Sequence, residues 1–351
     1  MNKINTLQIL RAFAALSVVV THVFQKSTFK PFGSYFLSGQ YGVDIFFILS
    51  GFLIYITTRN QSNPWDYLKK RLFRIFPAYW LALTCYTLCY LISNQISLNF
   101  KIVLQNVLMI PWDSRWKYDS LIVGVAWSTM FEMFFYILFF ILISLRLKRK
   151  VILFLIPSLL LIFIPLSRSF PFLENVPFIS LFVSIASSPF LIMFFIGSLI
   201  GNFYLTNKIP LINKSIYKYI LIGSIVLMII TMLLMYNILL SALSATLLFM
   251  SVMQYERYFS LNFKNLAIAK SIWLGDISYS IYIFHVLIIT IFKNVLFINY
   301  IPSLLVLTMI TTIFVSKYSF NYIEKKFIEL GRNQKRSLRT ISLSLTDTTG
   351  A

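Results

Sequence analysis

Long apolar runs, each near the roughly 20 residues that a helix needs to cross the hydrocarbon core of a bilayer, recur from one end of this chain to the other. Only 12% of the residues are charged, whereas a soluble protein of this size carries about 25%. The sequence therefore predicts an all-α integral membrane protein with about ten transmembrane helices. The expected spans are residues 6–25, 40–58, 75–93, 122–145, 150–166, 179–203, 216–236, 238–254, 273–293 and 300–320.

Charge alternates along the connectors between these runs. The basic connectors are residues 59–74, 146–149, 204–215, 255–272 and 321–351. Those with fewer Lys and Arg, and more aromatic residues, Pro and Ser, are residues 26–39, 94–121 and 167–178. Because basic loops stay in the cytoplasm, we expect both termini to be cytoplasmic. The net charge of +20 is then a topology signal, and no nucleic-acid partner is expected.

The chain reads as one membrane domain with a short tail. Residues 1–330 hold every expected span, with no internal repeat and no cleavable signal peptide. We expect residues 331–351 to be a disordered, basic and polar cytoplasmic tail whose basic start lies near anionic membrane lipid. Cys85 and Cys89 lie four residues apart in one run, and we expect them to pack on one helix face.

Six ionisable residues fall inside the apolar runs, where a charge is costly and is a functional hypothesis by default. They are Arg11, His22, Asp44, Glu132, Asp276 and His285. A structural ion pair, or a side chain that reaches toward the interface, is the alternative interpretation. The chain has only two histidines, and both lie in these runs.

Position along each helix predicts the depth of these groups. Arg11 and His22 are eleven residues apart, about three turns, so they share a face and are separated by roughly 16 Å. The topology puts Arg11 in the cytoplasmic half. It puts His22 and Asp44 toward the outside, where the carboxylate could fix the tautomer of the imidazole. Glu132 and His285 fall near the middle of the membrane.

Two arginines in KKRLFRIFPAYW (residues 69–80) lie at the expected cytoplasmic start of a helix. Arg71 and Arg74 are three residues apart and share a face, and arginine pairs bind phosphates through forked hydrogen bonds. A topology anchor is the alternative. With the buried groups, the pair indicates a polar path for a phosphate-bearing donor that reacts toward the outer face. Asp276, near the start of a later helix, would suit the helix dipole as a cap.

Five segments, in this order, resemble the acyltransferase-3 family, integral-membrane enzymes that O-acylate bacterial surface polysaccharides. The segments are LRAFAALSVVVTH, GVDIFFILSGFLI at 42–54, KRLFRIFPAYW at 70–80, WSTMFEMFFY at 127–136 and LGDISYSIYIFH at 274–285. The resemblance covers about residues 5–330. Some larger members add an extracytoplasmic hydrolase-like domain. Without one, this chain most resembles the O-antigen (lipopolysaccharide) and exopolysaccharide acetylases.

The resemblance implies roles for matched positions. These are Arg11 and His22, then Arg71 and Arg74, then Trp127, Ser128 and Glu132, and finally Tyr279, Ser280, Tyr282 and His285. With the depth of each group, the catalytic candidates become His22, Asp44, Glu132 and His285. The donor-binding candidates are Arg11, Arg71 and Arg74. Supporting roles are expected for Trp127, Ser128, Asp276, Tyr279, Ser280 and Tyr282.

The family's donors are acyl-CoA, most often acetyl-CoA, and its acceptors are sugar hydroxyls. The resemblance thus implies acetyl-CoA as co-substrate and a polysaccharide or lipid-linked oligosaccharide as acceptor, in a multi-pass protein of the bacterial inner membrane. Acyl transfer needs a base that works near neutral pH, which imidazole supplies. We expect His22 to act as this base or to become acylated. No zinc spacing and no G-x-S-x-G elbow stands out, so neither a metal nor a serine acyl-enzyme is expected.

Two other functions stay open from the sequence. A transporter or flippase of a lipid-linked glycan would also have many spans and a charged interior, although it predicts two similar halves. Transfer of a succinyl or longer acyl group is the second. The sequence leaves the oligomeric state and the identity of the sugar open.

Overall fold

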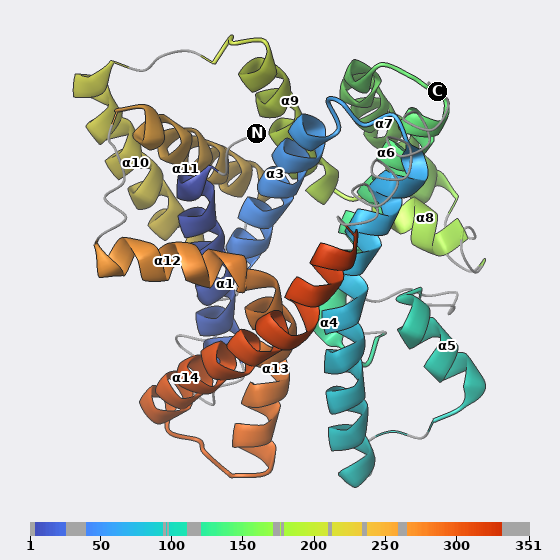
Figure 1. Ribbon diagram of the computed structural model, residues 1–351, viewed down its shortest axis with the longest axis vertical. Coiled ribbons are helices and arrows are strands. Elements are labelled where there is room, and N and C mark those ends of the chain that lie inside the picture. The colour runs from blue at the N-terminus through green and yellow to red at the C-terminus, as the bar shows by residue number, and fades with distance from the viewer. Residues whose placement is uncertain are drawn as a thin grey trace, which may run out of the picture.

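The computed structural model describes residues 4–25, 40–93, 96, 98–110, 121–170, 176, 179–209, 213–233, 237–258 and 265–331. Within these ranges every regular element is helical (Figure 1). The α-helices are α1 (Asn5–Gln25), α3 (Gln40–Thr57), α4 (Pro64–Ile92), α5 (Phe100–Leu108), α6 (Trp127–Ser144), α7 (Ile152–Ser169), α8 (Ile179–Ala186), α9 (Phe190–Leu205), α10 (Lys214–Leu233), α11 (Ile238–Tyr258), α12 (Leu266–Asp276), α13 (Ser278–Asn294) and α14 (Ile301–Ser319). Shorter elements are the 3₁₀ helices η2 (Gly124–Ala126) and η3 (Arg149–Val151) and the π-helical turn η5 (Phe320–Glu324).

Several helices are long and apolar enough to cross a membrane. Among the described residues there are six, namely α1, α4, α6, α7, α11 and α14. The number rises to eight if each bent pair is one span, α8 with α9 at 57° and α12 with α13 at 74°. The shorter apolar helices α3 and α10 coincide with the two remaining predicted spans. The protein is all-helical and multi-pass, while ten spans and cytoplasmic termini stay predictions.

Helix α4 begins earlier than the sequence predicted. The side chain of Asn63 accepts hydrogen bonds from two backbone N–H groups of the first turn, and Pro64 takes the first helical position. Both features favour a helix start at this point. The predicted connector at 59–74 is therefore wrong beyond residue 63. Arg71 and Arg74 lie about two and three turns inside the helix rather than at its start.

The predicted span at 273–293 begins as two helices with a sharp bend between them. Asp276 ends α12, and α13 starts two residues later. Asp276 directly precedes Ile277, the N-cap of α13, whose own side chain makes no cap bond, and a cap role for Asp276 stays a prediction. Figure 1 shows α12 lying across α1. Gly275 permits this approach, since a Cβ there would lie 2.1 Å from the carbonyl oxygen of Gln8.

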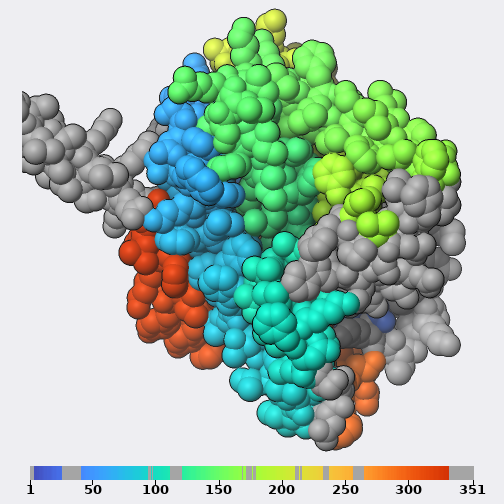
Figure 2. Space-filling view, turned by 90° about the vertical axis from the view of Figure 1, so that its right-hand side faces the viewer, coloured from blue at the N-terminus to red at the C-terminus, as the bar shows by residue number. Residues whose placement is uncertain are grey.

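Helical structure also extends into other predicted connectors. Helix α5 lies within 94–121 and α12 begins within 255–272, and helical structure continues after α14, through η5, to Gly331. Figure 2 shows α5, in teal, against the lower half of α4. Tyr79 Oη donates to the carbonyl oxygen of Asn106 at 2.6 Å and joins the two helices. The predicted tail beyond Gly331 lies outside the described residues.

Helices α3 and α9 cross so closely that two glycines form the contact. A Cβ at Gly51 would lie 2.2 Å from the carbonyl oxygen of Phe194, and one at Gly197 would lie 2.0 Å from that of Ile48. Small residues let membrane helices approach in this way. The crossing holds α3, which carries one wall of the pocket described below.

Replacing Gly197 with Ala is expected to lower the free energy of unfolding by about 1–3 kcal/mol, because a backbone oxygen cannot move aside without shifting α3. The matched control is Gly223→Ala in α10, where a Cβ would meet no atom within 4 Å. Thermal unfolding of the purified variants in detergent measures the effect. Equal melting temperatures for the two variants would contradict the close crossing.

Candidate active site

A narrow pocket inside the protein collects residues from α1, α3, α4, α6 and α13. Its polar lining comprises Arg11, Ser50, Arg71, Arg74, Ser128, Thr129, Glu132, Tyr136, Tyr279 and Tyr282. The space that the centre of a water molecule can occupy is about 70 Å³, several times the roughly 10–15 Å³ that one water needs. The pocket thus suits a thin, chain-like ligand.

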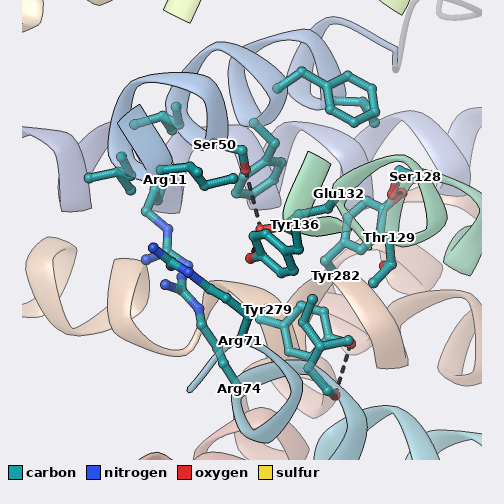
Figure 3. A pocket seen from close by; sticks show the side chains of 17 residues that line it. Arg11, Ser50, Arg71, Arg74, Ser128, Thr129, Glu132, Tyr136, Tyr279 and Tyr282 are labelled. Carbon is teal, nitrogen blue, oxygen red and sulfur yellow. Dashed lines mark hydrogen bonds between the residues drawn. The ribbon is translucent and has the colours of Figure 1, made fainter. Parts of the chain in front are cut away.

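Three guanidinium groups meet at one end of this pocket (Figure 3). Arg11 reaches it from α1, and Arg71 and Arg74 reach it from α4. Arg11 lies within electrostatic range of Arg74, which opposes its charge, and of Glu132 and Asp276, which favour it. Like charges gathered around one cavity favour a bound polyanion, and guanidinium forks match phosphate geometry.

Arg71 is held from three sides. Its Nη2 donates a hydrogen bond to Thr57 Oγ1 at 2.7 Å. Its guanidinium carbon lies 5.5 Å from the ring centre of Tyr67 and 5.3 Å from that of Tyr136. Such cation–π contacts stabilise the guanidinium while the planar group keeps its remaining donors. The side chain is therefore preorganised at the mouth of the pocket.

Glu132 is the carboxylate in the centre of the pocket. It accepts hydrogen bonds from Tyr136, one turn along α6, and from Ser50 of α3 at 3.4 Å. Neither partner is among the residues predicted from the sequence. Tyr136 could have been found, because a residue four positions after Glu132 shares its helix face. No sequence signal marks Ser50, because the approach of α3 to α6 is a tertiary contact.

The two histidines of the chain form a pair. His285 Nε2 lies 3.2 Å from His22 Nδ1, and the ring centres are 4.9 Å apart. His285 on α13 is fully buried, whereas His22 on α1 is partly exposed. The structure thus joins two catalytic candidates that the sequence placed at different depths.

Backbone contacts determine the tautomer of each ring. His285 Nδ1 lies 2.6 Å from the carbonyl oxygen of Tyr282, and His22 Nδ1 lies 3.0 Å from that of Val18. A carbonyl oxygen only accepts, so both Nδ1 atoms carry hydrogen when the rings are neutral. His285 Nε2 then accepts from His22 Nδ1–H, which it shares with Val18. The lone pair of neutral His22 is consequently on Nε2, the orientation that a general base requires.

Tyr282 connects the pocket to this pair. Its Oη accepts a hydrogen bond from Ser128 at 2.8 Å and donates to the carbonyl oxygen of Val125 at 3.1 Å. Its ring lines the pocket and lies 5.8 Å, centre to centre, from that of His285. Ser128 and Tyr282 lie on the side of the pocket away from the arginines (Figure 3), and the histidine pair adjoins Tyr282 outside the lining.

Six predicted site residues lie outside the pocket lining, namely His22, Asp44, Trp127, Asp276, Ser280 and His285. Asp44 is fully buried and accepts a hydrogen bond from Ser241 of α11. The Nδ1 contacts that fix the His22 tautomer come instead from Val18 and His285. A catalytic role for Asp44 stays a prediction. Trp127 packs against an aromatic cluster, with ring centres 5.3–6.4 Å from those of Phe47, Phe131 and Phe190.

A further buried carboxylate escaped the sequence analysis. Glu324 of η5 accepts a hydrogen bond from Ser280, which also bonds Ser319 at 2.9 Å, and it lies within electrostatic range of Arg74 and Arg11. Ser280 thus contacts Glu324 and does not belong to the pocket lining, and its supporting role stays a prediction. In the sequence, the segment around Glu324 has the composition of a basic connector. Glu324 follows Phe320 by four residues, one helical turn, and this spacing could have indicated a helix there.

The helices and this pocket together define a class of protein: a multi-pass helical membrane protein whose arginine pocket leads to a histidine pair. A family model described as an acyltransferase domain matches residues 4–317. The chain therefore belongs to the acyltransferase-3 family, which confirms the resemblance and makes it an acyltransferase. It is also similar to the exopolysaccharide production protein ExoZ of Rhizobium meliloti (strain 1021), with 29% identity over 271 residues, 74% of this chain and 79% of that protein. No solved structure matches.

Proposed function

We propose that this protein transfers an acetyl group from acetyl-CoA to a sugar hydroxyl of an exopolysaccharide, or of its lipid-linked precursor, in the bacterial inner membrane. One observation carries the proposal: three arginines lie at one end of a narrow pocket, and Tyr282, which lines the other end, has its ring 5.8 Å from that of His285 in the histidine pair. The first end suits a polyphosphate, and the second suits a proton transfer. Acyl-CoA has its phosphates and its thioester at opposite ends of a thin arm.

The donor enters from the side of the arginines. The CoA diphosphate lies against Arg11, Arg71 and Arg74, and the neutral pantetheine arm follows the pocket past Glu132 toward Ser128. Moving the charged nucleotide through hydrocarbon would be prohibitive, whereas the arm needs only a narrow path. The small width of the pocket favours acetyl over a longer acyl group.

The transfer step uses His22 as the general base. Its Nε2 takes the proton of the sugar hydroxyl while the hydroxyl oxygen attacks the thioester carbonyl carbon. A C–O bond forms, the C–S bond breaks, and the CoA thiolate takes up the proton from His22. His285 accepts the Nδ1–H of His22 and so stabilises the imidazolium during the step. The hydroxyl of Ser128 is the nearest lining donor for the developing oxyanion.

The polymer is inferred from the similarity to ExoZ, which is named as an exopolysaccharide production protein. O-antigen is a second acceptor with the same reacting group. Nuclear magnetic resonance of whole-cell polysaccharide, with and without the gene, tests the class of reaction. An acyltransferase adds an ester to the sugar. A transporter changes the amount of polysaccharide and leaves its decoration intact.

Sealed vesicles test the direction of transfer. We expect inside-out vesicles to incorporate label from externally added labelled acetyl-CoA, and right-side-out vesicles to remain unlabelled, because the predicted topology puts Arg71 and Arg74 on the cytoplasmic side. Permeabilised right-side-out vesicles, which should regain labelling, are the control for intact protein. Equal labelling of both sealed orientations would overturn a cytoplasmic donor.

A further inference from the structure

A second, wider pocket is lined by the segments where α3 leads into α4 and where α6 leads into α7; Figure 1 shows these connections near its top. Five cationic side chains line it, and its lining contains no acidic residue. The cations are Arg59, Arg146, Lys148, Arg149 and Lys150. The space open to the centre of a water molecule is about 780 Å³, against about 70 Å³ in the narrow pocket. It has room for a group much bulkier than the pantetheine arm.

This pocket has an apolar floor as well as a charged rim. Phe139, Leu142 and Ile143 of α6 line it together with the cations. Loop lysines that only fix topology require no such floor. A nucleotide needs apolar surface and cations side by side. Its planar base packs against the apolar side chains, and its phosphates pair with the cations.

The rim is built by defined backbone and side-chain contacts. Arg149 Nη1 donates to the carbonyl oxygen of Tyr55 at 3.2 Å, and its guanidinium carbon lies 5.1 Å from the centre of the Tyr55 ring. Arg146 follows the end of α6 with a φ of 54°, a left-handed conformation usually given to glycine. The Leu147 N–H bonds the Leu142 carbonyl oxygen at 2.9 Å and closes the helix there. Arg146 thus occupies a backbone conformation in which glycine would be less strained.

The two pockets are neighbours along two helices. On α3, Thr57 bonds Arg71 of the narrow pocket, and the next residue, Thr58, lines the wide one. On α6, Glu132 and Tyr136 line the narrow pocket and Phe139 and Ile143 line the wide one. The α6 residues recur at a spacing of three or four, so they follow one face of the helix over roughly 16 Å.

We infer that the wide pocket binds the adenosine 3′-phosphate end of the acyl-CoA donor. This inference rests on the proposed function. The CoA diphosphate then lies at the three arginines, between the two pockets. The pantetheine arm runs one way along α6 and the nucleoside runs the other. The adenine base packs on the apolar floor, and the 3′-phosphate pairs with the cations of the rim.

Binding of adenosine 3′,5′-bisphosphate tests this without requiring turnover. The full chain is placed in nanodiscs of phosphatidylcholine, and binding is measured by isothermal titration calorimetry. The test variant replaces three rim cations with Gln, at Arg146, Lys148 and Lys150. The matched control replaces three exposed lysines outside both pockets, Lys208, Lys218 and Lys270. It removes the same charge.

We expect the wild type and the control to bind alike, and the rim variant to bind at least roughly tenfold more weakly, since each lost charge-assisted contact alone accounts for about that factor. Circular dichroism confirms that both variants are folded. No binding by the wild type, or equal weakening in both variants, would overturn the inference. An anionic lipid headgroup is the rival occupant. If it fills the pocket, the wild type does not bind the bisphosphate, and the rim variant loses phosphatidylglycerol in native mass spectrometry.

Acyl transfer then separates this inference from the function on which it rests. In the rim variant we expect KM to rise for acetyl-CoA and to stay unchanged for acetyl-4′-phosphopantetheine, which lacks the nucleoside. A rise for both donors would overturn the nucleotide site. No transfer by the wild type from either donor, with bisphosphate binding intact, would overturn the proposed acyl transfer and leave the nucleotide site standing.

Discussion

Replacing His22 with Gln is expected to lower acyl transfer about 10²–10⁴-fold, the usual contribution of a positioned base. Glutamine is close to histidine in size and can bond Val18 through its amide, but it cannot take a proton from the sugar hydroxyl. Ester formation on the acceptor, with labelled acetyl-CoA and purified protein in vesicles, measures the loss. The protein should still insert and accumulate, since α1 keeps its apolar packing.

Ser17→Ala is the matched control for this change. Ser17 lies on the same helix, and its hydroxyl bonds the carbonyl oxygen of Ala14 at 2.9 Å. That variant should transfer at the wild-type rate. Full activity in His22→Gln would show that His22 is not the base and would leave His285 as the candidate.

The same assay resolves the role of His285. His285→Gln removes the acceptor of the His22 Nδ1–H while Val18 still holds the tautomer. We expect a smaller loss than for His22→Gln, confined to kcat, with KM for acetyl-CoA unchanged. A lower kcat with an unchanged KM is the result expected when a residue positions the base and does not bind the donor. A rise in KM alone would instead place His285 in donor binding.

Replacing Arg71 and Arg74 together with Lys is expected to raise KM for acetyl-CoA about 10–100-fold or more, although the charge is kept. A lysine ammonium cannot form the forked pair of hydrogen bonds to phosphate, and a charged hydrogen bond contributes about 1.5–3 kcal/mol. Lysine also lacks the planar group that lies against Tyr67 and Tyr136. Initial rates across donor concentration measure the effect.

Lys69→Arg is the matched control, a Lys/Arg exchange on the same helix outside the pocket lining. Its ammonium lies 5.3 Å from the centre of the Phe73 ring, and the exchange preserves both charge and stacking. We expect an unchanged KM. If the double lysine variant also kept the wild-type KM, the two arginines would be topology anchors rather than phosphate ligands.

Much of the candidate site could be predicted from the sequence, because buried charge in an apolar helix is conspicuous. Arg11 and Glu132 stand out in this way, Arg71 and Arg74 stand out as a pair on one helix face, and the structure brings all four into one pocket. Helix ends were harder. The start of α4 at Pro64 depends on a local cap that an apolar-run analysis overlooks. The bend after Asp276 depends on a glycine contact with another helix.

That the chain is a helical membrane protein, and which family it resembles, follows from local patterns in the sequence. Long apolar runs need a bilayer, and five motifs occur in the family's order. Which polar groups meet depends on the packing of the helices. His22 and His285 are 263 positions apart, and Ser241, which donates to Asp44, is 197 positions from it. The sequence indicates how deep a residue lies along its helix. It does not indicate how that helix is rotated or which helices lie beside it, so these partners depend on how the helices pack.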